Sequence, residues 1–581
     1  NPVDWRKIKY DAVSLIILLS SGIGIYFRFT GGRQKTTKEY FVADGSMSVT
    51  TVAIGLMASY LSAVSLLGVS SENYVYGTQY AVINVSYGLA TPVVAYLYLP
   101  VFFKLGATSA FEYLEKRFGS ETRVVASIAF LLQLLLYTGV VLYAPALALE
   151  ATTGISTTYS VVIIGLVCTF YSTLGGIKAV LITDVFQSIL MFVAVLTVIV
   201  TAAVSVGGIG GIWQIADRGG RIEFDNISPD PTVRHTWWSL TVGGFFTYLS
   251  LYAVNQVQVQ RMLTVKNLKS AQMALWWSWP IASTMSLITC FSGLSIYSKY
   301  HDCDPVRSDR ISSNDQLMPR YVMDTLSRYP GVPGLFVAGI FSAGLSTVSA
   351  TLNSLAAVIL EDYVKPILTA KTSAYLGKGL ALLVGLTCLA VAFLARYLGG
   401  VLQAALTIFG VVGGPMLGLF TLGMFTESAN QKGAITGLIT SLAFSLWIGF
   451  GEPKPAAPTL PVHVFGCNFT NFRNPQETSA RLKTRFRSTE DDSYFYLYGI
   501  SYLWYCPLGF LVCTILGIVV SLASKLVQEE KSGELDTNLF VPFLASRIAK
   551  KRETKAARIT AEMAEYNIGK YEAGQARVYA G

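Results

Sequence analysis

Long apolar runs separated by short polar segments dominate this chain. A helix needs about 20 mostly apolar residues to cross a bilayer, and about thirteen runs reach that length. They lie at residues 10–29, 49–75, 79–103, 123–149, 157–177, 183–206, 237–260, 270–298, 333–360, 374–396, 399–425, 432–450 and 494–524. The pattern therefore predicts an all-α, polytopic membrane protein in contact with a lipid bilayer.

Three of these runs carry more polar side chains than contact with lipid favours. IGLMASYLSAVSLLGVSSENY, around residue 60, mixes Ser, Tyr and Gly, and FSAGLSTVSATLNSLAAVILED (341–362) holds seven Ser, Thr and Asn residues. The third, around residue 250, places Asn255, Gln256, Gln258 and Gln260 near the bilayer. Such helices either pack closely through small and hydroxyl side chains or line a path for a cation and a substrate. Packing is the better reading for any single Ser, whereas three such helices in one chain favour the path.

The Ser/Tyr segment opens a block of five predicted spans, and the Asn/Gln segment opens the next block of five. Interrupted helices at matching places in two halves are typical of transporters built from inverted repeats. The expected division is 1–48 (outer N-terminus, first span and first loop), 49–206 (first repeat), 207–236 (outer loop), 237–425 (second repeat), 426–524 (spans twelve and thirteen) and 525–581 (tail).

Composition agrees with this class, since 52% of the 581 residues are hydrophobic and 14% are charged, against about 25% charged in soluble domains. The net charge is +9, but Lys and Arg lie in short loops and in the tail and form no stripe with interleaved aromatics. This distribution argues against a nucleic-acid partner and for membrane orientation.

Basic residues mark the odd-numbered loops: Arg28, Arg33, Lys35 and Lys38; Lys104, Lys116 and Arg117; Arg261, Lys266 and Lys269; Lys365, Lys371 and Lys378. The positive-inside rule makes these loops cytoplasmic. We therefore expect a multi-pass plasma-membrane protein with an extracellular N-terminus and a cytoplasmic C-terminus, although the basic segment WRKIK near the N-terminus runs against the scheme. The Lys/Arg/Glu/Ala-rich tail is expected to form a solvated helix.

The loops placed outside hold the sequons Asn226-Ile-Ser and Asn468-Phe-Thr, which makes both asparagines candidates for glycosylation. Pro229 directly after the first sequon weakens it, and Asn84-Val-Ser lies within a span. Cys303 and Cys467 also lie in outer loops, either joined by a disulfide or as two unpaired thiols. The other five cysteines lie in apolar runs, and no spacing of Cys and His indicates a metal site.

The hydroxyls of the 341–362 segment suit an alkali ion. Sodium prefers about five or six oxygen ligands, by the logic that governs other hard cations. Ser346 and Thr347 are adjacent and about 100° apart on a helix, so both can reach one ion, together with the carbonyl of Ala343 one turn earlier. Neutral oxygens also release the ion more easily than a carboxylate would.

The sequence resembles the sodium/solute symporters, on EYFVADGSMS (39–48), YSTLGGIKAVLITDVFQ (171–187), NQVQVQRML (255–263) and the stretch 414–434. The second of these matches the family signature GGxxAVxWTDxxQ, except that Ile182 stands where Trp is usual. LYTGVVLYAPALAL and ISPDPTVRHTWWSL are similar to the branch of the monocarboxylate, multivitamin and iodide carriers. The resemblance implies a leucine-transporter-like fold with five-plus-five inverted repeats, spans two and seven broken, and sodium-driven alternating access.

The resemblance also implies site residues. The common sodium site falls on the carbonyls of Ala58, Leu61 and Ala343 and the hydroxyls of Ser346 and Thr347. A second sodium site would involve Ser62, Ser65 and Tyr137, although Ser65 and Ala405 stand where the iodide carrier has Gln and Ser. Substrate would contact Tyr60, Ser65, Asn84, Tyr87, Tyr248, Tyr252 and Gln403. Asp184 corresponds to an acid on the inner sodium exit path, or is a surface acid near the inner face.

The sequence thus predicts a sodium-coupled symporter that imports a small monocarboxylate-like anion, with Na+ as the coupling ion and no other cofactor. Alternatives are a vitamin-type carrier for biotin or pantothenate, a carrier of iodide or another small anion, or a sensor that binds solute without transport. An enzyme is not expected, because the only histidines (His235, His301 and His463) lie in outer loops and no nucleophile–base pair is evident. A channel is disfavoured because no acidic ring or carbonyl filter motif is present.

Overall fold

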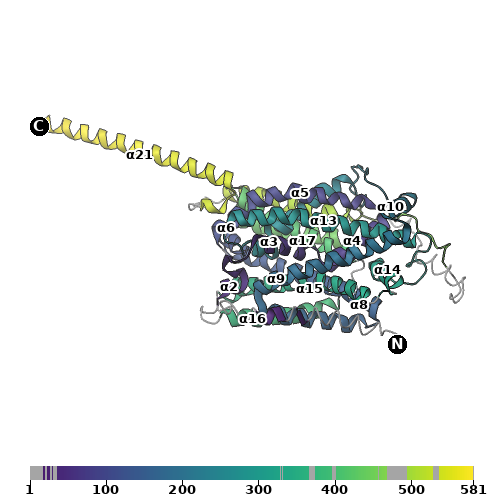
Figure 1. Cartoon of the computed structure of the whole chain (residues 1–581). Coiled ribbons are helices and arrows are strands. Elements are labelled where there is room, and N and C mark those ends of the chain that lie inside the picture. Colours follow the sequence, from purple (N-terminus) through teal and green to yellow (C-terminus); the bar gives the residue numbers. More distant parts are fainter. Residues whose placement is uncertain are drawn as a thin grey trace.

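The computed structural model describes residues 18–19, 22–26, 29, 36–106, 108–327, 329, 331–365, 373–394, 401–455, 457–467, 494–527 and 536–579. Within these residues every regular element is a helix. The long helices lie side by side as a bundle, and one helix, α21 (Pro542–Tyr579), projects from one end (Figure 1). The predicted all-α class is confirmed.

The helices of the first half follow the predicted runs and add short helices between them. They are α2 (Thr37–Val42), α3 (Val49–Tyr60), α4 (Ala63–Tyr76), α5 (Ile83–Val93), α6 (Leu99–Leu105), α7 (Glu112–Phe118), α8 (Ser120–Thr153), α9 (Thr157–Val206) and α10 (Ile209–Arg218). A π turn at Val94–Tyr98 joins α5 to α6, so Thr78–Leu105 forms one apolar span.

The second half contains the remaining α-helices of the described residues. They are α11 (Gly244–Leu249), α12 (Gln256–Met262), α13 (Leu268–Tyr300), α14 (Leu317–Leu326), α15 (Val332–Ile359), α16 (Ser373–Ala392), α17 (Val401–Phe425), α18 (Gln431–Phe450), α20 (Tyr505–Val527) and α21. π turns at Ser239–Gly243 and Ser250–Val254 flank α11, and a third, Leu360–Val364, extends α15.

Eight helices of the described residues are long and apolar enough to cross a membrane, or nine when the bent pair α3 and α4 is one span. Two shorter apolar helices, Ser239–Val254 and Leu376–Ala392, match further predicted runs. The first predicted run, 10–29, lies mostly outside the described residues, so the count of thirteen spans stays a prediction.

A sharp bend in α9 replaces the loop expected between the runs 157–177 and 183–206. At Gly176 the backbone has φ 59° and ψ −166°, and the helix continues on both sides. A Cβ at this position would lie 2.9 Å from the backbone oxygen of Tyr40 in α2, so the close contact also requires glycine. The bend divides one 50-residue helix into two segments.

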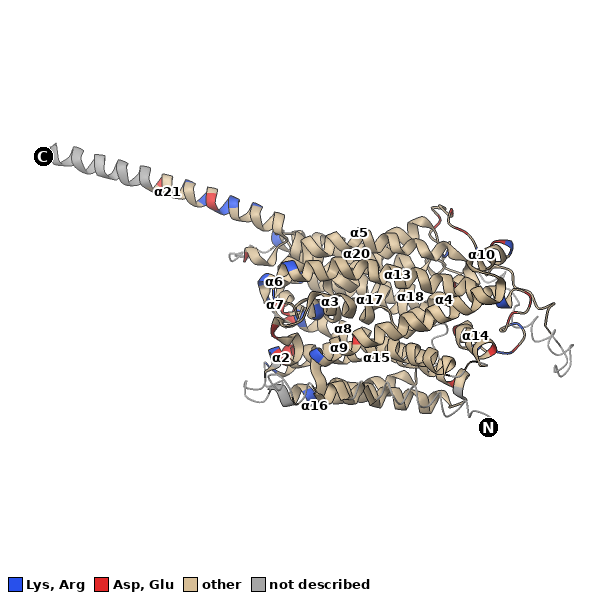
Figure 2. Cartoon of the chain, in the orientation of Figure 1, with Lys and Arg blue, Asp and Glu red and all other residues tan. Residues whose placement is uncertain are grey.

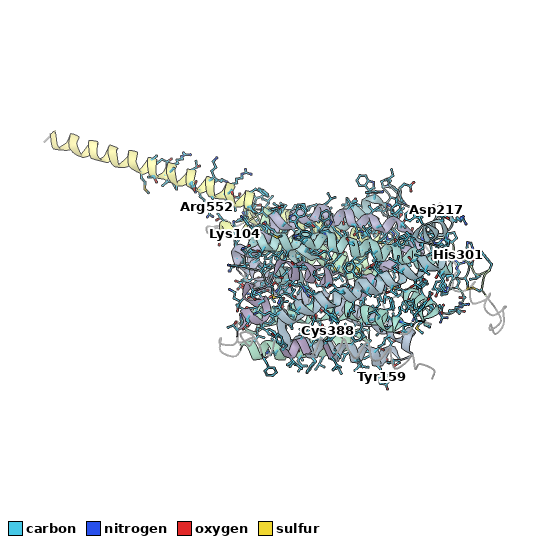
Figure 3. The ribbon with its side chains drawn as sticks, viewed as in Figure 1. Lys104, Tyr159, Asp217, His301, Cys388 and Arg552 are labelled. Carbon is cyan, nitrogen blue, oxygen red and sulfur yellow. A yellow bond between two sulfur atoms is a disulfide. The ribbon has the colours of Figure 1, made fainter. Side chains whose placement is uncertain are left out.

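Charged side chains gather at the two ends of the bundle, while its middle is largely uncharged (Figure 2). Lys104 and Arg552 lie at one end, and Asp217 and His301 lie at the other (Figure 3). The first end also carries α2, α7 and α21, and we call it the inner end because the positive-inside rule predicts it to be cytoplasmic. The opposite end, with α10 and α14, is called the outer end.

Candidate functional site

The second predicted span is broken near its middle. α3 ends at Tyr60, where the N–H of Leu61 donates to the Met57 carbonyl, and α4 begins at Ala63 with its axis bent by 59°. Leu61 and Ser62 between them are extended, with ψ of 95° and 176°. A helix end leaves carbonyls of its last turn without partners in the helix, so the carbonyls of Ala58 and its neighbours become available as ligands.

The seventh predicted span is broken as well. Asn255 is extended (φ −74°, ψ 128°), and its side chain accepts a hydrogen bond of 2.9 Å from the N–H of Val257 at the start of α12. Two contacts tie this break to the first one. The Gln258 amide donates to the Ser59 hydroxyl at 3.1 Å, and the Tyr252 hydroxyl donates to the Leu56 carbonyl at 3.3 Å.

A cavity of about 70 Å³ lies where the two breaks meet. Its lining includes Ser59, Tyr60, Leu61, Ser62, Val64, Ser65, Val69, Tyr80, Tyr87, Leu134, Tyr137, Leu251, Asn255, Val257, Gln258, Ser286, Thr289, Thr347, Thr351, Leu402, Ala405, Leu406 and Phe409. None of these lining residues carries a charged side chain. The wall combines apolar side chains with hydroxyls and two amides.

The structure brings part of the predicted site together in this cavity. Leu61 and Thr347 of the sodium set line it, as do all three residues predicted for a second ion, Ser62, Ser65 and Tyr137. The Ser62 hydroxyl is buried near the Tyr137 phenol without a hydrogen bond of normal geometry.

Three of the predicted substrate contacts, Tyr60, Ser65 and Tyr87, line the cavity, and the Tyr60 hydroxyl donates to the Tyr87 hydroxyl at 2.7 Å. Tyr248 and Tyr252 lie outside the lining, stacked on each other with ring centres 4.2 Å apart, and Tyr60 packs edge-on against both. The two tyrosines therefore support the wall.

Asn84 and Gln403 also lie outside the cavity lining. The Asn84 amide donates to the Ala81 carbonyl of its own turn. Gln403 is exposed at the outer end, where its side-chain oxygen accepts from Arg234. The resemblance was the only sequence signal for these two residues, and a match by position gives no direction for the side chain.

The sodium hydroxyls lie on α15, one of the most buried helices of the bundle. Thr347 donates to the Ala343 carbonyl at 3.2 Å, and Ser346 donates to a carboxylate oxygen of Asp184 at 2.5 Å. A hydroxyl that gives its proton away keeps its lone pairs for another partner. Both hydroxyls can therefore still act as oxygen ligands.

Asp184 is fully buried, which makes the alternative of a surface acid wrong. Its second carboxylate oxygen lies 2.5 Å from a guanidinium nitrogen of Arg261, whose side chain is also buried. The assignment of Arg261 to a basic loop is wrong as well, because it lies on α12 inside the bundle. Its position three residues after Gln258, in a polar stretch, could have indicated that it lies on the same helix. Its pairing could not be read from the sequence, because Asp184 lies 77 residues away.

A vestibule of about 510 Å³ at the outer end was not predicted. Leu402 lines both the vestibule and the central cavity, and it packs against Gly68 of α4. Arg234 reaches over this vestibule, with two nitrogens 2.6 and 3.1 Å from the Glu72 carboxylate and a third 3.2 Å from Gln403. These contacts join α4 to α17 above the cavity.

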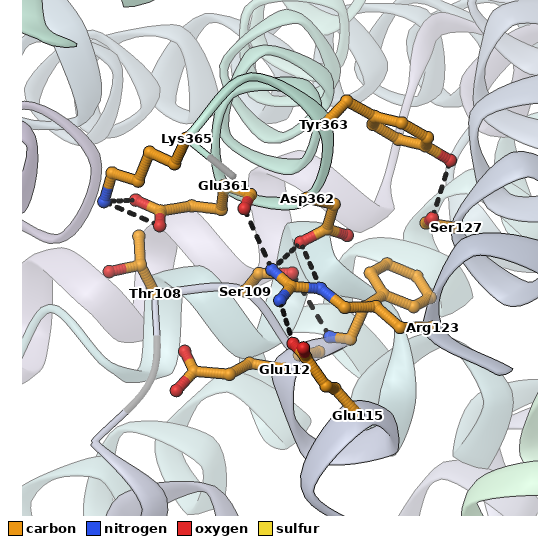
Figure 4. Close-up of polar contacts among 12 residues, drawn as sticks. Thr108, Ser109, Glu112, Glu115, Arg123, Ser127, Glu361, Asp362, Tyr363 and Lys365 are labelled. Atoms are coloured by element: carbon orange, nitrogen blue, oxygen red, sulfur yellow. Dashed lines mark hydrogen bonds and ion pairs between the residues drawn. The ribbon is translucent and has the colours of Figure 1, made fainter. Parts of the chain in front are cut away.

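At the inner end, one arginine joins three helical segments (Figure 4). Arg123 of α8 pairs with Glu115 of α7 and with Asp362 in the π turn after α15. Nearby, the hydroxyls of Tyr363 and Ser127 are hydrogen-bonded at 2.7 Å. These contacts anchor the inner end of the helix that carries Ser346.

The outer loops hold the remaining predicted residues. Cys303, after α13, is joined to Cys467, after α18, by a disulfide bond. Asn226 lies in the loop before the seventh predicted span, where its amide donates to Glu223 at 3.4 Å. Asn468 lies outside the described residues.

A membrane bundle in which two broken helices meet at a buried, hydroxyl-lined cavity is the architecture of secondary transporters. The sequence profile described as the sodium:solute symporter family matches residues 40–441. The chain belongs to this family, and it is a multi-pass membrane transporter and not an enzyme, with Na+ and a small-molecule solute as its partners.

Curated relatives cover nearly the whole chain. A putative sodium-dependent multivitamin transporter of Drosophila melanogaster is 51% identical over 564 residues, which cover 94% of this chain and 92% of that protein. The sodium-coupled monocarboxylate transporter 1 of Homo sapiens is 43% identical over 542 residues, which cover 90% and 87%. The sodium-coupled monocarboxylate transporter 2 of Bos taurus is 41% identical over 530 residues, which cover 90% and 84%.

Solved structures share the fold. A Na+-coupled sialic acid symporter in a substrate-bound outward-open state superposes with a TM-score of 0.71 at 22% identity, covering 89% of this chain and 98% of that one. A nucleobase-cation-symport-1 family transporter in a closed conformation gives a TM-score of 0.51 at 13% identity, covering 86% and 97%. The predicted leucine-transporter-like fold class is confirmed.

Proposed function

We propose that the protein is a sodium-coupled symporter of the plasma membrane that imports a small organic anion with one carboxylate by alternating access. The observation that carries this proposal is the uncharged cavity at the two helix breaks, which offers carbonyls and hydroxyls to a cation and helix N–H groups to an anion. An outer N-terminus and a cytoplasmic tail complete the topology that we propose.

The sodium site is proposed at Ala58, Leu61, Ala343, Ser346 and Thr347. α3 supplies carbonyls from its unwound end, and α15 supplies two hydroxyls that keep free lone pairs. Neutral oxygens of this kind are suited to a hard cation that must also leave again.

The anion is proposed to bind beside the start of α4. Ser62, the residue before this 14-residue helix, makes no side-chain cap and lines the cavity. The first N–H groups of the helix therefore face the cavity region without a capping acceptor, and they carry partial positive charge. With no Lys or Arg in the lining, such a site suits a single carboxylate better than a multiply charged acid.

The named substrates of the relatives support an organic anion in this site. Two of the relatives quoted above are named as monocarboxylate transporters and one as a multivitamin transporter. A monocarboxylate-like anion is our first candidate, and a vitamin-type carboxylate such as biotin or pantothenate is the second. Iodide is third, because Ser65 and Ala405 depart from the iodide carrier at the cavity wall.

The energy of one ion suffices for accumulation. A sodium ion falling through about 60 mV gains roughly 1.4 kcal/mol, and a tenfold concentration gradient adds about as much. One ion could therefore sustain about a hundredfold gradient of a neutral solute. A monoanion carried with one sodium is electroneutral, so an inward current would require at least two sodium ions per cycle.

An uptake panel tests the proposal. Cells expressing the protein receive labelled short-chain monocarboxylates, biotin, pantothenate, iodide or glucose, in sodium or in choline. We expect sodium-dependent uptake of a carboxylate and none of glucose. Sodium-independent uptake of every compound would contradict the proposal.

Reconstitution separates a transporter from a sensor. Proteoliposomes with an inward sodium gradient should accumulate the active compound above its outside concentration, and collapse of the gradient should release it. Saturable binding without accumulation would instead indicate a solute sensor on the same fold.

A further inference from the structure

A buried ion pair lies directly behind the proposed sodium site. Arg261 of α12 and Asp184 of α9 are in contact at 2.5 Å, with side chains 1% and 0% exposed. α3 passes over the pair, since a Cβ on Gly55 would lie 3.0 Å from the guanidinium and 3.6 Å from the carboxylate. The pair therefore links the two broken spans to the helix of the family signature.

The hydroxyl of Ser346 separates the Asp184 carboxylate from the proposed sodium ion. The other oxygen of this carboxylate accepts the proton of Ser346, which is itself a proposed sodium ligand. If the negative charge of this carboxylate were not compensated by Arg261, it would strongly increase the affinity of the site for a cation. A unit charge a few ångströms away in a low-dielectric interior changes the affinity for an ion by more than about tenfold.

The guanidinium is poorly matched to its surroundings as a hydrogen-bond donor. Its Nε and its second terminal nitrogen are both buried without a hydrogen-bond partner among the described residues. Unmade hydrogen bonds of a buried charged group are costly. A neutral amide could donate to Asp184 at a smaller cost, so what arginine adds here is its positive charge.

We propose that Arg261 is a positioning residue that masks the charge of Asp184, so that the neighbouring sodium site holds its ion weakly enough to release it in every cycle. This inference rests on the sodium site proposed above. While the pair is intact, the ion is held by neutral oxygens, and the charge of the nearby Asp184 is compensated by Arg261. Without Arg261, the ion faces a bare carboxylate through Ser346.

A charge cycle tests the inference. Sodium affinity is measured on purified protein without substrate, by titrating ²²Na+ binding, and on cells as the sodium concentration for half-maximal uptake. Arg261→Gln should lower the half-saturating sodium concentration at least about tenfold and slow maximal uptake, because release becomes difficult. Asp184→Asn should raise the half-saturating sodium concentration by a similar factor, because the positive charge of Arg261 then lacks its partner.

The double variant and the conservative variant give the decisive comparison. Asp184→Asn with Arg261→Gln should return sodium affinity to within about threefold of the parent, since both charges are gone. Arg261→Lys, which keeps the charge, should also stay near the parent. Arg558→Gln is the matched control, because it breaks an exposed arginine–glutamate pair in α21 and should change nothing.

Opposite shifts of sodium affinity in the two single variants, with recovery in the double variant, would establish that Arg261 compensates the charge of Asp184. Weaker sodium binding in both single variants, or Arg261→Lys behaving like Arg261→Gln, would overturn this inference in favour of a purely structural pair. Absence of any sodium binding by the parent protein would instead refute the sodium site itself, so the two failures are distinguishable.

Discussion

Ser346 and Thr347 are neighbours on α15 with different surroundings. Ser346 faces the carboxylate of Asp184, whereas Thr347 borders the central cavity and donates to the carbonyl one turn back. Ser346 thus lies on the side of the proposed ion site that faces Asp184, and Thr347 lies on the side that faces the cavity. This division could not be predicted from adjacency on a helix.

Removal of either hydroxyl should abolish sodium coupling. We expect Ser346→Ala and Thr347→Ala to eliminate sodium-stimulated uptake while surface expression persists, because each loses one of about five oxygen ligands. Uptake in sodium and in choline, normalised to surface biotinylation, gives the measurement. Thr387→Ala on the exposed face of α16 is the matched control, since its hydroxyl, like that of Thr347, donates to a carbonyl of its own helix. Normal sodium dependence of both variants would refute the site.

His235 makes the outer end sensitive to acid. Burial lowers the pKa of its ring below the ordinary 6.5, although Glu72 lies 3.1 Å away and favours the charged form. Arg234, Glu223 and the rings of Tyr76, Tyr80 and Tyr502 are its other neighbours. Since the folded protein resists protonation of this ring, the free energy of unfolding should decrease as the pH falls from about 6.5 through the lowered pKa.

The melting temperature between pH 7.5 and 5.5 measures this effect. The parent should lose stability over this range, and His235→Gln should lose less. His301→Gln, which changes a partly exposed histidine, should behave like the parent. A pH dependence that is equal in all three proteins would place the sensitive group elsewhere.

The sequence alone predicted the kind of side chains in the site better than it predicted which residues form it. Thr347, expected from the polar residues of its span, and Leu61, Ser62 and Ser65, implied by the resemblance, line the cavity. Their roles as ligands stay predictions. The same reasoning missed Arg261, because a basic residue after a run of glutamines has the appearance of a loop charge. Only the fold brings it to Asp184.

At the scale of elements, interruptions matter more than lengths. Breaks in spans two and seven were expected from the polar residues of these spans and from the resemblance, and they occur at Leu61–Ser62 and at Asn255. The bend in α9 was misplaced as a loop, since Gly176 is followed directly by residues that continue the helix. The short helices α10 and α14 were not predicted, because each has only ten residues and lies between the long apolar runs on which the prediction was based.

The bend at Gly176 gives an element-scale prediction. Gly176→Ala should lower the free energy of unfolding by about 1–3 kcal/mol from the backbone conformation alone, and the contact with Tyr40 should add to this loss. Gly379→Ala on α16 is the control, because nothing lies within 4 Å of the added Cβ and the residue has no unusual backbone conformation. Thermal unfolding in detergent compares the two. Equal stability of both variants would show that the bend tolerates other residues.

At the scale of the whole molecule, one covalent bond joins distant parts of the outer end. The disulfide closes a segment with a sequence separation of 164 residues, between the loops that follow α13 and α18. Sequence placed both cysteines on one side of the membrane but left their pairing open, because positions in different loops give no distance.

Loss of this bond should destabilise the protein by about 2–5 kcal/mol. Cys303→Ser, Cys467→Ser and the double variant should show the same decrease in melting temperature, because each removes the same bond, and a reducing agent should affect only the parent. Cys513→Ser in α20, which changes a free buried cysteine, controls for the substitution itself and should keep its sensitivity to reduction. Unequal single variants would argue against the pairing.

The contact between Arg261 and Asp184 has a consequence for electrical recordings. Its two unit charges touch and cancel, so the pair moves through the membrane field as a dipole with no net charge to displace. A voltage step on the sodium-free carrier should thus evoke little transient current from this region. Voltage sensitivity that arises in this region of the working protein would then originate in the permeating ions themselves.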